Sequence, residues 1–137
     1  MSTQPGKITR IITTVARFLL GLPLVVFGLN LFFNFIPQPE TPMPEGAVAF
    51  AGALVESGYM MPLIGITQLF VGLCLLTNLF VPLALVVFFP FMLNSVLFHV
   101  YLEPAGLPMA GVFMALNLFL AFLYRAAYRP LLTAKFV

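Results

Sequence analysis

The only histidine of the chain, His99, precedes Glu103 by four residues, which places both side chains on one face of a helix. A histidine can gain or lose a proton near neutral pH, so the two residues form a candidate proton-accepting pair, with Ser95 one turn earlier. The alternative is an interfacial pair that closes a helix bundle and caps the turn at Pro104. This second interpretation is favoured, because both residues are expected where water reaches them.

Three amide side chains form a second candidate site. Gln68, Asn94 and Asn117 lie in three different apolar segments. At 1.5 Å per residue, each is about 14–18 Å from the end of its segment, so a common layer is predicted. Pro90 frees the carbonyl of Val86, which an amide could satisfy. The layer is either a pocket for a quinone head group or a lipid, or a set of hydrogen bonds between helices. The second is favoured because the amides are neutral.

The sequence offers little for metal or haem chemistry. One histidine and one cysteine, Cys74, cannot complete a closed metal site, and a single cysteine forms no intramolecular disulfide. The seven methionines are typical fillers of apolar helices. No metal site and no intrinsic cofactor are therefore predicted, and the expected bound molecules are a quinone or a lipid. The net charge of +2, without a basic run, argues against nucleic acid as a partner.

The elements that must position these residues are membrane helices. With 62% hydrophobic and 7% charged residues, the chain has a membrane composition. We predict an all-α membrane protein of one domain, residues 1–137, as an up-down-up-down bundle of four transmembrane helices. A short interfacial helix is expected in the first outer loop, after the proline-rich stretch PQPETPMP. The predicted membrane helices are about 11–36, 59–78, 82–102 and 108–128, and the short helix is about 45–57.

The charges predict the orientation. All six lysines and arginines precede the middle of the first helix or lie at or beyond the end of the fourth, and all four glutamates lie in the two loops of the other side. By the positive-inside rule, both termini are expected in the cytoplasm. The basic residues are Lys7, Arg10, Arg17, Arg125, Arg129 and Lys135.

Glycines recur every seven residues in the first two membrane helices. Gly21 and Gly28 lie in the first, and Gly58, Gly65 and Gly72 are assigned to the second, with Gly58 also a candidate C-terminal cap of the short helix before it. A seven-residue period keeps one stripe facing a neighbouring helix, and small residues let two backbones approach. We predict that all five glycines serve helix packing.

Four stretches carry a family resemblance. They are ARFLLGLPLVVFGLN (16–30), ESGYMMPLIGITQLFVGLCLL (56–76), FFPFMLNSVLFHVYLEPAGLPMA (88–110) and YRAAYRPLL (124–132). Along nearly its whole length the chain resembles the DoxX-like (DoxX/DoxD) family of small bacterial membrane proteins. The resemblance implies a four-helix bundle in the inner membrane and a link to thiosulfate:quinone oxidoreduction or to complexes with redox partners. Gln68 stands where such families often show an acidic residue.

Two functions from different classes remain. The first, which the sequence favours, is a non-catalytic accessory or scaffolding subunit packed in a larger membrane complex. The alternative is a membrane component of a quinone-linked oxidoreductase of the thiosulfate:quinone type. A transporter ranks third because no inverted repeat is evident. The expected partners are membrane lipids and other membrane subunits, or further copies of this chain.

Overall fold

A computed structural model describes residues 4–135 and 137, and every regular element among them is a helix. The helices α1, α3 and α4, and the η1–α5 segment, are long and apolar enough to cross a membrane. The prediction of an all-α, four-helix membrane protein is therefore confirmed. The elements are α1 (Lys7–Phe33), α2 (Glu45–Glu56), α3 (Met60–Thr77), α4 (Val81–Tyr101), η1 (Pro104–Gly106), α5 (Leu107–Leu123) and η2 (Arg125–Leu132).

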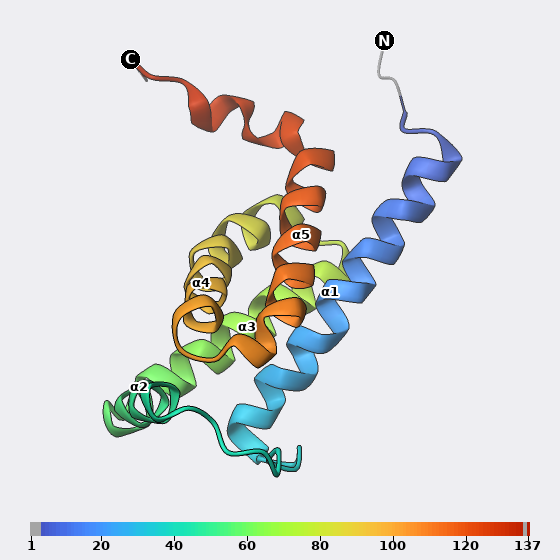
Figure 1. Ribbon diagram of the computed structural model, residues 1–137. Helices are drawn as coiled ribbons and strands as arrows, with labels where there is room; N and C mark the ends of the chain where they lie inside the picture. Colours follow the sequence, from blue (N-terminus) through green and yellow to red (C-terminus); the bar gives the residue numbers. More distant parts are fainter. Residues whose placement is uncertain (1–3, 136) are drawn as a thin grey trace.

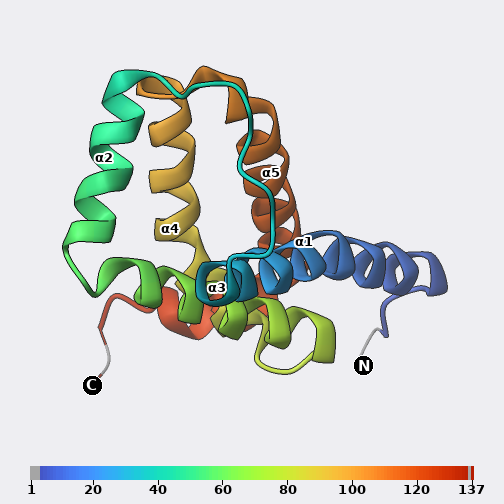
Figure 2. The same cartoon turned by 90° about the horizontal axis from the view of Figure 1, so that it is seen from below.

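The four long helices form two pairs. The most extensive contact is between α1 and α3, and the next is between α4 and α5. Figures 1 and 2 show that the helices within each pair run in opposite directions, and that the two pairs cross at an angle. The start of α1 and the η2 segment lie at one end of the molecule, here named the basic end. The helix α2 and the loop before it lie at the other, named the acidic end.

The core lies between the two pairs. Its members recur at helical spacing; in α4 they include Val81, Leu85, Phe88 and Met92, each at most 2% exposed. They pack against buried leucines of α1, α3 and α5. The outward faces of the same helices carry exposed isoleucine, leucine and phenylalanine side chains. An apolar face of this extent on membrane-length helices is suited to contact with lipid tails.

The α1–α3 contact is made at the predicted glycines. A Cβ on Gly28 would lie 3.1 Å from the backbone oxygen of Gly65, and one on Gly72 would lie 3.0 Å from the backbone oxygen of Gly21. Contacts this short leave no room for a side chain, so the two backbones touch directly.

Gly58 does not belong to this contact. A Cβ on it would meet no atom within 4 Å, and its φ of +78° is the left-handed conformation that glycine adopts without strain. The helix α3 begins only at Met60, so Gly58 lies in the turn after α2. The prediction that Gly58 serves helix packing is corrected, because the seven-residue period was extended past the start of the helix.

The first helix begins and ends earlier than predicted, at Lys7 and Phe33. Asn34 takes a left-handed conformation and donates its N–H to the oxygen of Asn30. The Asn30 side chain in turn accepts the N–H of Ile36 at 2.7 Å. The two asparagines therefore end the helix by satisfying backbone groups that the next turn would have paired.

The last membrane helix is also shorter than predicted, because α5 ends at Leu123 and the chain continues as the 3-10 segment η2. There the Tyr128 hydroxyl donates to the Pro82 carbonyl at 2.9 Å, which holds η2 against the start of α4. At the acidic end, α2 rests on α4, with the rings of Phe50 and Phe98 5.5 Å apart.

Candidate functional site

The predicted pair His99 and Glu103 is formed at the end of α4. The His99 Nδ1 lies 2.8 Å from Glu103 Oε2 and 2.9 Å from the Glu103 backbone oxygen. Both of these atoms are acceptors, so Nδ1 carries the hydrogen, and Nε2 is the acceptor of the neutral ring. The same carboxylate oxygen accepts the N–H of Gly106 at 3.1 Å. The pair therefore also caps η1, the turn between α4 and α5.

His99 lines a cavity of about 270 Å³, whose other lining residues come from α1, α3, α4, η1 and α5. Its polar side chains are those of His99, Ser95 and Gln68. The walls are mostly aromatic and aliphatic, which is usual for a site that takes a small apolar molecule with a polar end. The aromatic wall residues are Phe27, Phe88, Phe91 and Phe113.

Gln68 enters this cavity from α3. Its Oε1 is buried and has no hydrogen-bond partner among the described residues. A buried acceptor left unpaired costs about 1–3 kcal/mol, so the position favours a molecule that donates a hydrogen bond. The sequence had assigned Gln68 and His99 to two separate sites, whereas the structure brings them to one cavity.

The other two amides lie elsewhere. Asn117, which is 1% exposed, lines a different cavity together with Val86 and Pro90. Asn94 is exposed on α4. The three amides therefore do not form the common layer that their depth in the helices predicted. Asn94 follows the buried Met92 by two residues, about 200° around the helix, so it lies on the opposite face from the core.

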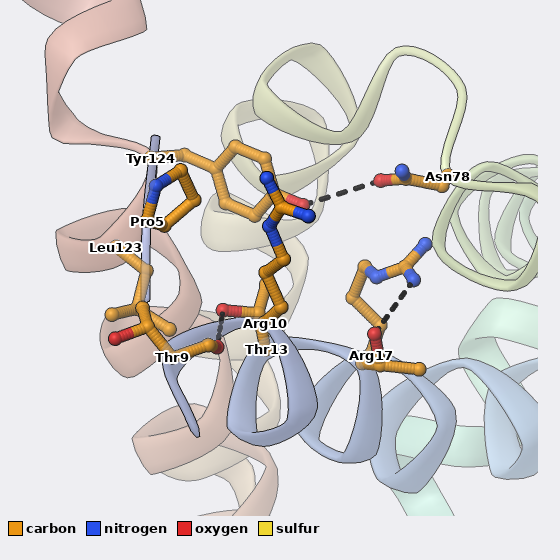
Figure 3. Close-up of a pocket in the computed structure, with 9 residues that line it drawn as sticks. Pro5, Thr9, Arg10, Thr13, Arg17, Asn78, Leu123 and Tyr124 are labelled. Carbon is orange, nitrogen blue, oxygen red and sulfur yellow. Dashed lines mark hydrogen bonds between the residues drawn. The ribbon is translucent and has the colours of Figure 1, made fainter. Parts of the chain in front are cut away.

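Sequence reasoning missed one residue, Arg17, which had been counted only among the charges that set orientation. Its side chain is 7% exposed, and its Nη1 donates to the Leu75 carbonyl near the end of α3 at 3.1 Å. It lines a second polar cavity at the basic end of the molecule (Figure 3). A signal was present in the sequence, because Arg17 is a charged residue inside the apolar helix predicted over about 11–36.

Comparison with known proteins gives one match. No curated protein and no solved structure matches the chain. The family model DoxX matches residues 12–101, more than half of the 137 residues. The matched segment contains most of α1 and all of α2, α3 and α4, and it includes Arg17, Gln68 and His99. The chain therefore belongs to the DoxX family.

Proposed function

We propose that this protein is an accessory subunit of a membrane redox complex, and that its own part is to bind the head group of a quinol. The proposed site is the cavity between α1, α3, α4 and α5. The observation that carries the proposal is the unpaired, buried Oε1 of Gln68, a residue that lines the same cavity as His99.

The hydrogen-bonding groups of the cavity favour the reduced form of the ring. Gln68 Oε1 is an acceptor, and His99 Nε2 is an acceptor when the ring carries its hydrogen on Nδ1 alone. A quinol donates two O–H groups, whereas a quinone offers only carbonyl oxygens. The four phenylalanine rings of the wall would contact the flat ring edge-on or in an offset stack. A quinol therefore matches both the polar end and the apolar walls.

In this site His99 would accept a proton from the quinol, with Glu103 as its hydrogen-bond partner. Oxidation of a quinol releases two protons and two electrons, and His99 can accept one proton at Nε2 while the other leaves to water. Glu103 fixes the orientation of the ring and stabilises the positive charge that protonation creates. In this proposal the two electrons pass to a redox cofactor on another subunit of the complex, since one histidine and one cysteine of this chain cannot complete a closed metal site.

A packing role without any ligand is the second candidate. It is supported by the Glu103 carboxylate, which accepts hydrogen bonds from both His99 and Gly106 and so closes the α4–α5 turn. In this case His99 and Gln68 serve only the fold, and the complex would bind its quinol elsewhere.

The test compares Gln68→Leu and His99→Gln with Asn94→Leu, which removes an exposed amide outside the cavity. Native membranes with matched amounts of each variant would be assayed for quinol oxidation, and the purified proteins for retained quinol by mass spectrometry. We expect both cavity variants to lose about tenfold or more in quinol retention, with complex assembly intact and Asn94→Leu unchanged. Equal retention and turnover in all three variants would leave the packing role.

A further inference from the structure

The cavity at the basic end holds two guanidinium groups and no acidic side chain. It has a volume of about 400 Å³ and lies between the first turns of α1, the end of α3 and the end of α5. Figure 3 shows Arg10 and Arg17 on the side of α1 that faces Asn78 and Tyr124. Thr9, Thr13 and Thr14 also line it, and the Thr13 hydroxyl already donates to the Thr9 backbone oxygen. The four glutamates of the chain lie in the loops and helix ends of the other end.

Arg17 is buried, but the neighbouring groups satisfy its hydrogen-bond donors and its positive charge only in part. Its Nη1 donates to the Leu75 carbonyl, and its Nη2 lies 3.4 Å from Thr14 Oγ1. Its Nε is buried and has no partner among the described residues. The carbonyl end of α3 supplies only a partial negative charge, equivalent to about half an elementary charge. Arg17 as a residue is only 7% exposed, and its positive charge therefore lacks a full counter-charge.

We propose that this cavity binds the phosphate oxyanion of the head group of an anionic membrane lipid. Guanidinium groups pair with phosphate through parallel hydrogen bonds, and hydroxyl and amide groups complete such sites. The Tyr124 hydroxyl donates to Asn78 Oδ1 at 3.3 Å, so the Asn78 amide nitrogen remains a donor. Arg10 is exposed and donates to Gln4, and its position at the mouth adds a second positive charge.

The surroundings favour a lipid over a free anion. Thr14 lines both this cavity and an apolar groove of about 340 Å³ on α1, which Phe18 and Leu19 also line. The groove and the polar cavity share Thr14, so an acyl chain would lie along this outer face of α1 when the head group is in the cavity. Basic residues near the membrane surface attract anionic lipid head groups. This site lies at the opposite end from the His99 cavity, so the inference does not depend on the proposed function.

The test measures lipid adducts of the purified, full-length protein in detergent by native mass spectrometry. Phosphatidylglycerol, phosphatidylcholine and inorganic phosphate are added separately. The variants are Arg10→Gln and Arg17→Lys, which keeps a positive charge that can reach Leu75 but removes Nε. The control is Lys7→Gln, which removes one charge from the same helix outside the cavity.

We expect phosphatidylglycerol to bind at least about tenfold more tightly than phosphatidylcholine, and each arginine variant to weaken it by about tenfold. Lys7→Gln should bind as the parent protein does. Equal binding of the two lipids, or equal phosphatidylglycerol binding in all variants, would overturn the proposal. Displacement of the lipid by millimolar inorganic phosphate, with no preference for the lipid, would assign the cavity to a free anion and would overturn the lipid assignment.

Discussion

A Cβ added to Gly72 of α3 would lie only 3.0 Å from the backbone oxygen of Gly21 in α1. The two helices thus meet backbone against backbone. Gly65 is different, since the atoms that a Cβ there would meet belong to the ring of Phe32. A side chain can turn away from a new methyl group, whereas a backbone atom of a packed helix cannot.

Gly72→Ala is therefore expected to destabilise the fold by about 1–3 kcal/mol, and Gly65→Ala by less. Gly111→Ala is the matched control, because its Cβ would meet no atom within 4 Å and alanine favours helix by about 1 kcal/mol. Thermal unfolding in detergent would rank the three variants. If Gly72→Ala unfolds at the same temperature as Gly111→Ala, the close approach of α1 and α3 is ruled out.

Replacing Asn117 with leucine should leave stability unchanged or raise it by about 1 kcal/mol, because its buried Nδ2 has no partner among the described residues. Asn94→Leu should change little, since Asn94 is exposed. Chemical unfolding of the two variants checks this. A loss of about 2 kcal/mol or more in Asn117→Leu would show that the Asn117 amide makes an essential polar contact.

The orientation of the chain is tested by labelling cysteines in intact cells. With the basic end in the cytoplasm, Thr41→Cys should react with a membrane-impermeant maleimide and Thr133→Cys should not. Both positions are exposed, so accessibility of the side chain does not bias the comparison. The native Cys74 is buried and serves as the background. Labelling of Thr133→Cys alone would reverse the orientation.

The Tyr128 hydroxyl should make stability fall at alkaline pH. Burial, and to a lesser degree the neighbouring Tyr124, raise the pKa of Tyr128 above its usual value. The hydroxyl must be protonated to donate to Pro82, so its contribution is complete below the unfolded pKa of about 10 and is lost as the pH rises through the higher folded value. Tyr128→Phe should melt lower than the parent at pH 8 and show a smaller further drop above pH 10.

The control for this experiment is Tyr101→Phe, which changes an exposed tyrosine at the end of α4. It should follow the parent protein at every pH. An identical alkaline drop in the parent and Tyr128→Phe would mean that the Pro82 contact does not contribute to stability.

The sequence predicted the four membrane helices well, because long apolar runs between charged or proline-rich segments leave few alternatives. It also predicted the glycines of the α1–α3 contact, since a seven-residue period fixes a face. Depth alone did not place the amides. Asn94 has the expected distance from the start of α4, yet its face is turned away from Phe88 and Met92.

The periodicity of the sequence could not predict which residue a long side chain contacts. Arg17 and Leu75 are far apart in the sequence, and only the antiparallel pairing of α1 with α3 brings them together. For the same reason the sequence assigned Gln68 and His99 to different sites. Their shared cavity depends on how the α1–α3 pair crosses the α4–α5 pair. Local patterns specify faces, whereas the crossing of helices decides which faces meet.

The Arg17–Leu75 hydrogen bond also has a consequence for the order in which the helices insert during biosynthesis. The ribosome releases α1 before it has made α3, so the Arg17 guanidinium first enters the membrane region without the carbonyl that later accepts from it. A lone charge at that depth disfavours burial of the surrounding turns. We therefore expect the first half of α1 to settle only when α3 arrives, so that two helices that are not neighbours in the chain integrate together.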